Sequence, residues 1–117
     1  MIEPNNWEKF LQEFSERNRE RRARFNVFFT SGETVEEAEE GHFKNALLDK
    51  SGNKTQVVIE RVDRGDEAEK TMSDPIDNVR GVAVQYETDG SENILEITDE
   101  KNTLFSLRFE SKLDGNS

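Results

Sequence analysis

The segment from residue 16 to residue 25 reads ERNRERRARF and is the first candidate for chemistry in this chain. Guanidinium groups bind phosphates and carboxylates, so its five arginines could contact nucleic acid or an acidic protein surface. Glutamates interleave with the arginines, no aromatic residues alternate with them to stack on bases, and the net charge of −10 repels bulk nucleic acid. We therefore interpret the run as the solvated end of a helix, with docking onto an acidic protein patch as the alternative and nucleic acid excluded. The arginines are Arg17, Arg19, Arg21, Arg22 and Arg24.

A second candidate is the acidic segment ETVEEAEEGH, residues 33–42. Carboxylates and a histidine could ligate a hard divalent cation. However, the segment lacks the Asp-rich spacing of a calcium loop, and the chain has no second histidine for a zinc site. We interpret it as an acidic surface that guards a strand edge, and we expect no metal. Its candidate side chains are Glu36, Glu37, Glu39, Glu40 and His42.

Catalytic residues are not indicated by the pattern. His42 could act as a general base beside Thr30 or Ser31, but a nucleophile and base also need a third group that orients the base. The chain has no cysteine, which excludes disulfides and thiol catalysis, and it has no Gly-rich phosphate motif. The sequence therefore predicts a protein that is not an enzyme and holds no cofactor.

An N-terminal helix is the element that positions the arginine run. Asn5 with Glu8 has capping-box spacing, and an apolar stripe follows at i, i+3, i+4 and i+7. Good helix formers continue after this stripe as far as Ala23. The stripe consists of Trp7, Phe10, Leu11 and Phe14.

Strand patterns fill the rest of the chain. The segment RFNVFFT (24–30) alternates, and six further strands are predicted at roughly 43–49, 55–62, 68–73, 79–88, 93–98 and 103–110. Asp89-Gly90 predicts a hairpin turn. Asp74-Pro75 predicts the end of a strand and an irregular crossover, with a binding loop as the alternative. Residues 33–41 fit a short helix or an edge strand equally well.

These elements predict an α+β fold in one domain, residues 1–112, with a frayed tail at 113–117. An N-terminal amphipathic helix would pack on a curled antiparallel β-meander of about six strands, either open or barrel-like. The chain shows no signal-peptide pattern and no apolar run of membrane-spanning length, so we expect a cytoplasmic protein without membrane contact.

Two stretches also resemble a known family. The opening WEKFLQEFSERNRERRARFNV resembles that of an uncharacterised bacterial family, the domain of unknown function 5335, which has the form W-x-x-F-x-x-x-F-S. The stretch SDPIDNVRGVAVQYETDGSENILEITDEKNTLFSLRF is similar to that family's proline-isoleucine segment, acidic turn and closing strands. The middle stretch HFKNALLDKSGNKTQVVIE departs from the family, because it lacks the proline-leucine start of the second strand. The resemblance implies a small sheet domain with a helix, and it implies no activity and no site residues.

The function expected from these observations is that of a non-enzymatic interaction or accessory domain that acts through protein contacts. The arginine helix end and the acidic rim would together form its contact surface, which would also permit head-to-tail self-association. One alternative is a domain that binds a small molecule in a pocket of the curled sheet. Another is an acidic nucleic-acid mimic that inhibits a DNA-binding protein. The expected surface comprises Arg17, Arg19, Arg21, Arg22, Glu36, Glu37, Glu39 and Glu40.

Overall fold

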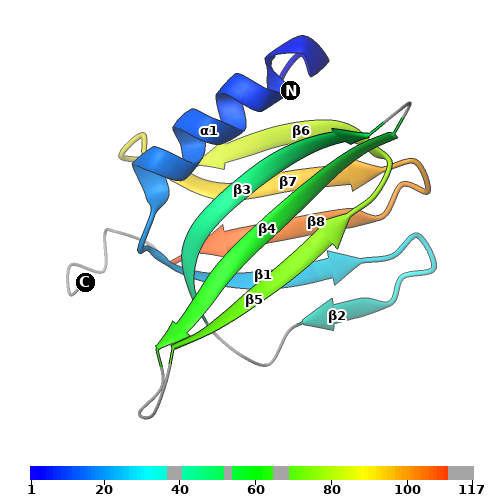
Figure 1. The fold of residues 1–117 in the computed structure, drawn as a ribbon. Helices are drawn as coiled ribbons and strands as arrows, with labels where there is room; N and C mark the ends of the chain where they lie inside the picture. The colour runs from blue at the N-terminus through cyan, green and yellow to red at the C-terminus, as the bar shows by residue number, and fades with distance from the viewer. Residues whose placement is uncertain (37–40, 52–53, 65–68, 111–117) are drawn as a thin grey trace.

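The computed structural model describes residues 1–36, 41–51, 54–64 and 69–110, and it places one helix against one antiparallel sheet (Figure 1). The predicted α+β class is confirmed. The short 3-10 turn η1 (Pro4–Asn6) leads directly into helix α1 (Trp7–Asn18). The strands are β1 (Arg22–Phe28), β2 (Thr34–Glu36), β3 (Gly41–Ser51), β4 (Lys54–Arg64), β5 (Glu69–Ile76), β6 (Val79–Tyr86), β7 (Glu92–Asp99) and β8 (Leu104–Phe109).

The sheet folds over itself without closing. Its strand order is β5-β4-β3-β1-β8-β7-β6, and β2 pairs with β1 beside this path. Strand β3 pairs with β1 at Arg22 and Ala23, whereas β2 pairs with the far half of β1 from Asn26 to Phe28. Beyond its short pairing with β1, β3 turns away from that strand. Strands β3, β4 and β5 then cross over the other strands of the sheet (Figure 1). The fold therefore has a concave inner side under the helix and a convex outer side.

The apolar core fills the inner side. The rings of Phe14 on α1, Phe43 on β3 and Phe109 on β8 contact one another, with centroids 5.5 to 5.7 Å apart. Trp7 is 5% exposed, and its indole N–H donates to the carbonyl of Ile2 at 3.0 Å. The predicted apolar stripe of the helix thus faces the sheet, and its edge residue Phe10 is partly buried.

The helix ends earlier than its sequence predicts. It stops at Asn18 rather than continuing to Ala23. The Glu20 N–H donates to the Phe43 carbonyl at 2.8 Å, and the Phe43 N–H donates to the Arg21 carbonyl at 2.8 Å. These backbone bonds to β3 replace helical ones, because intrinsic helix propensity is weak compared with tertiary pairing. Arg22 and Arg24 consequently belong to β1.

Several strand predictions need correction. The described strands number eight rather than about six. Of the ambiguous segment 33–41, Thr34–Glu36 is a strand, and residues 37–40 lie outside the described ranges. Pro75 lies within β5 rather than in a crossover, and β5 is an edge strand, where proline's missing N–H disrupts no second ladder. The Asp89-Gly90 turn is confirmed, with Gly90 at φ 88°. The predicted tail, 113–117, lies outside the described residues.

One charged side chain is buried on the inner side. Arg61 on β4 is fully buried, and its guanidinium lies 3.7 Å from the Asp74 carboxylate and 5.8 Å from the centre of the Phe25 ring. The acid and the aromatic face both stabilise the cation, but among the described residues the Arg61 Nε and Asp74 Oδ2 atoms are buried and make no hydrogen bond.

Candidate functional site

The first half of the arginine run holds the end of the helix to the sheet. Arg17 donates two hydrogen bonds to the Glu92 carboxylate, Nε to Oε1 and Nη2 to Oε2, each at 2.9 Å. Asn18 donates a third, from Nδ2 to Oε1 at 2.8 Å. The Glu92 side chain is only 8% exposed, whereas that of Arg17 is 48% exposed. Glu92 is therefore a nearly buried acid whose charge is satisfied by the helix end.

Arg21 completes this arrangement. Its guanidinium donates to the Asn18 side-chain oxygen at 2.9 Å and to the Glu92 backbone carbonyl at 2.6 Å. It also lies over the Phe109 ring, 4.5 Å from the centroid. Burial lowers the pKa of Arg21, although nearby acids including Glu92 counteract part of that effect. We name Arg17, Asn18, Arg21 and Glu92 the arginine clasp.

The pKa of Glu92 reflects the arginine clasp. Burial alone would raise it, but hydrogen bonds from Arg17 and Asn18, with the charges of Arg17 and Arg21, outweigh burial and lower it. Glu92 in turn raises the pKa of Arg17, chiefly through their shared hydrogen bonds. The clasp thus gives Arg17 and Arg21 a structural role, although Arg17 is still half-exposed to solvent.

The remaining arginines also contact the sheet. Arg19 is exposed, and it donates to the Lys44 carbonyl at 3.0 Å and to the Asn45 side-chain oxygen at 2.7 Å. Arg22 approaches Glu110 at 3.9 Å, and Arg24 approaches Glu36 at 3.6 Å. Arg17 and Arg19 are solvent-exposed, as the interpretation of a solvated run expects, but only Arg17 lies on the helix. The first three arginines also donate to acceptors on β3 and β7.

The acidic candidates are only partly described. Glu36 pairs with Arg24, while Glu37, Glu39 and Glu40 lie outside the described ranges. No group of three His, Asp or Glu side chains able to hold a metal ion occurs in the described part of the chain.

The catalytic candidates lie apart. His42 lies opposite Arg22 at one end of β1, and Thr30 and Ser31 follow the other end. The length of β1, about 20 Å for seven extended residues, separates the histidine from both hydroxyls. These residues do not form a nucleophile–base pair.

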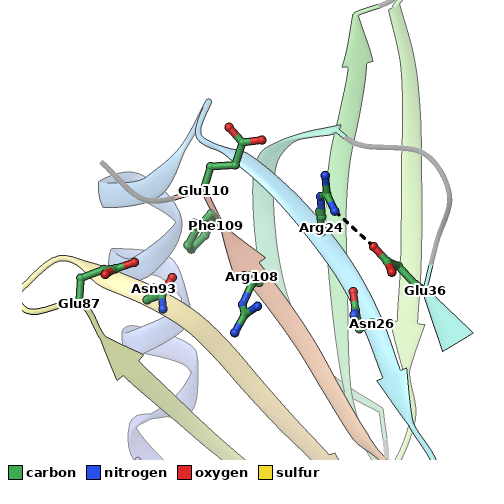
Figure 2. Close-up of a pocket in the computed structure, with 8 residues that line it drawn as sticks. All are labelled: Arg24, Asn26, Glu36, Glu87, Asn93, Arg108, Phe109 and Glu110. Atoms are coloured by element: carbon green, nitrogen blue, oxygen red, sulfur yellow. Dashed lines mark ion pairs between the residues drawn. The ribbon is translucent and has the colours of Figure 1, made fainter. Parts of the chain in front are cut away.

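A polar basin lies on the outer side of the sheet, and it was not predicted from the sequence (Figure 2). Leu107 and Phe109 point into the core, so Arg108 between them points to the opposite side, away from α1. The basin has a volume of about 740 Å³. We name it the outer basin, and its lining residues are Arg24, Asn26, Glu36, Glu87, Asn93, Arg108, Phe109 and Glu110.

Two arginines face each other in the outer basin. Arg24 on β1 is the direct cross-strand partner of Arg108 on β8, an arrangement of like charges that destabilises a sheet. Glu36 offsets the charge of Arg24 at 3.6 Å. Within the described ranges, the exposed guanidinium of Arg108 makes no ion pair and no hydrogen bond. Arg108 is therefore a cation available to a ligand.

Glu87, an acid whose charge counteracts part of the lowering of the pKa of Arg21 by burial, lies at the other side of the outer basin. Glu87 follows β6 directly, and its carboxylate also forms no ion pair with any described residue. Figure 2 shows the Asn93 amide between Glu87 and Arg108. Glu110 lies near Arg22 at 3.9 Å, so its charge is partly offset. Arg108 on β8, Asn93 on β7 and Glu87 after β6 thus place a cation, an amide and an anion next to one another across the outer basin.

Sequence reasoning named Arg24 and Glu36 as candidates. It missed Arg108, Asn93 and Glu87, because these residues lie on or beside separate strands and form no local cluster. Arg108 occupies an outward position in the alternating strand LFSLRFE, so its exposure was predictable, but its cross-strand partner was not. The register that brings Arg24 opposite Arg108 joins segments 84 residues apart in the chain.

Other surface features are smaller or less specific. A groove of about 400 Å³ runs between α1 and β3, and it includes Glu8, Glu16 and the half-exposed Leu47. Phe28 and Phe29 are partly exposed beside the β1–β2 turn. The groove also contains acids that form no ion pair with described residues, but its arginine, Arg19, is hydrogen-bonded to β3, so it offers no cation comparable with Arg108.

The functional proposal rests on the geometry of these residues, without support from a known relative. No helix in the described ranges is long and apolar enough to span a lipid bilayer. Comparisons with protein-family models, with curated proteins and with solved structures find no match to this chain.

Proposed function

We propose that this protein is a non-enzymatic interaction domain of the cytoplasm that binds a protein partner through the outer basin. The observation that carries the proposal is the Arg108 guanidinium, which is exposed, lies opposite Arg24 and has no acid of its own among the described residues. Placing two like charges opposite each other costs stability, and an acidic group of a partner would remove that cost.

The contact surface proposed here differs from the helix end that the sequence indicated. Arg17 and Arg21 are held in the arginine clasp, and Arg19 is bonded to β3. Glu36 is the described acid that belongs to both surfaces. The partner is a different protein or a second copy of this chain, and the resemblance to the domain of unknown function 5335 stays a prediction.

Two features favour protein contact over a small-molecule site. Pockets for small molecules are lined mostly by apolar side chains, whereas charged and amide side chains dominate the outer basin. The inner side of the sheet, where a ligand of a curled sheet would bind, holds a packed apolar cluster that includes Phe14, Phe43 and Phe109. The mixed signs of the basin also fit a protein surface better than a mimic of nucleic acid.

The test compares two charge reversals in an affinity capture from cell extract, with size-exclusion chromatography across a salt series for self-association. Arg108→Glu reverses the basin charge, and Arg80→Glu makes the same change at an exposed position on β6 outside the basin. We expect Arg108→Glu to weaken capture of a specific partner by about tenfold or more, the effect of about 1.4 kcal/mol or more at an interface. The Arg80 variant should capture the partner as the wild type does. Equal capture by all three proteins, or no partner together with a monomer at every salt concentration, contradicts the proposal.

A further inference from the structure

We infer that the outer basin recognises an extended peptide segment that carries one acidic and one basic side chain. This inference rests on the proposed function and narrows the partner to a chemical class. It follows from two charged groups and from the strand that separates them. The Arg108 guanidinium has no partner among the described residues. The Glu87 carboxylate forms no ion pair or hydrogen bond there, but its charge counteracts part of the lowering of the pKa of Arg21 by burial.

The spacing of these charges sets the size of the ligand. Arg108 lies on β8 and Glu87 follows β6, with β7 between the two strands. Neighbouring strands lie about 4.8 Å apart, which gives about 10 Å across the sheet. Glu87 lies level with Ser91 and Arg108 with Ile94, so the two residues are also offset by about 10 Å along β7 and stand about 14 Å apart. The charged groups of a free amino acid are only a few ångströms apart and cannot span this distance. Side chains at i and i+2 of an extended segment share one side and start about 7 Å apart, and two long side chains cover the remainder.

The chemistry of the lining gives each ligand group a partner. A carboxylate would accept bidentate hydrogen bonds from Arg108, with Arg24 adjacent across the strand pair. A lysine ammonium would pair with Glu87. The Asn93 amide, which both donates and accepts, would bond the peptide backbone between the two side chains.

The rim of the outer basin disfavours polyanions. Glu36 lies near Arg24 and Glu110 lies near Arg22, so each acid partly neutralises its neighbouring arginine. Both carboxylates would still repel a ligand that carries several negative groups. A segment of mixed charge is therefore favoured over an all-acidic segment.

The test is an NMR titration of the full chain with three capped tripeptides. The probes are acetyl-Glu-Gly-Lys-amide, acetyl-Glu-Gly-Gln-amide and acetyl-Gln-Gly-Lys-amide. We expect the mixed-charge peptide to bind about threefold more tightly than either of the others, the gain of one exposed ion pair. Its shifts should include the Asn93 side-chain amide, and the preference should vanish in about 1 M salt, where the screening length falls to about 3 Å.

Matched variants test which residue of the outer basin binds each charge of the peptide. Arg108→Gln should abolish the preference for the peptide glutamate, Glu87→Gln should abolish the preference for the peptide lysine, and Arg80→Gln should retain both. Equal affinity for all three peptides, absence of binding, or shifts confined to residues outside the outer basin would overturn the inference. If the peptides fail while partner capture still depends on Arg108, the proposed function stands and only the ligand class is wrong.

Discussion

Glu92 is the residue on which the end of the helix depends. Its carboxylate is almost buried, and it accepts hydrogen bonds from Arg17 and Asn18 while Arg21 donates to its backbone carbonyl. A buried acid without these partners would carry a large desolvation penalty. Arg17 and Arg21, which the sequence indicated as part of a contact surface, therefore stabilise the folded structure.

The first residue-scale prediction concerns Glu92→Gln, which removes the charge and keeps the shape. We expect it to lower the free energy of unfolding at pH 7 by about 1–2 kcal/mol, because charge-assisted hydrogen bonds to a nearly buried carboxylate become neutral ones. Urea unfolding measures the change. Glu16→Gln makes the same chemical change at an exposed helix position and should leave stability nearly unchanged.

The pH dependence of this difference follows from the lowered pKa of Glu92. A lowered folded-state pKa means that the contribution is fully present above the unfolded value of about 4.3 and is lost as pH falls through the folded pKa. The gap between wild type and Glu92→Gln should therefore narrow below about pH 4. A gap that stays constant down to pH 2 would mean that the carboxylate charge does not stabilise the clasp.

Helix α1 shows which interactions hold the elements together. Its buried face contains Trp7, Leu11 and Phe14, and its last turn is fixed by the arginine clasp. Arg22, in contrast, is exposed on β1 and lies 3.9 Å from an exposed Glu110. Burial of the apolar face should dominate over such surface ion pairs.

Trp7→Ala tests this ranking. We expect a loss of about 3–5 kcal/mol, because the substitution leaves a cavity between the helix and the sheet. Arg22→Ala should change stability by less than about 0.5 kcal/mol. Thermal or urea unfolding of both variants checks the order, and a larger loss for Arg22→Ala would show that the account of the helix is wrong.

Element-scale prediction from sequence succeeded where local periodicity decides the structure. The spacing of Trp7 and Phe14 predicted the buried face of the helix, and the alternation of Leu107 and Phe109 predicted a half-buried strand. The helix end was wrong because the backbone bonds of Glu20 and Arg21 to Phe43 lie beyond any local pattern. The candidate site was missed for the same reason, since strand register brings Arg24 to Arg108.

At the scale of the whole molecule, the two sides of the sheet have different roles. The inner side buries the aromatic core and the Arg61 side chain of the Arg61–Asp74 pair, and the outer side carries the charged basin. A strongly acidic chain gains solubility from its net charge, so the arginine pair Arg24 and Arg108 on one face is a local exception, and under the proposed function it would steer an acidic group to that face.

The most direct measurement of this account is hydrogen–deuterium exchange of the full chain with and without the captured partner. We expect the amides protected by the partner to cluster on β1, β7 and β8, around Arg24, Asn93 and Arg108. Protection confined to the α1–β3 groove around Leu47, or to the β1–β2 turn around Phe29, would contradict it.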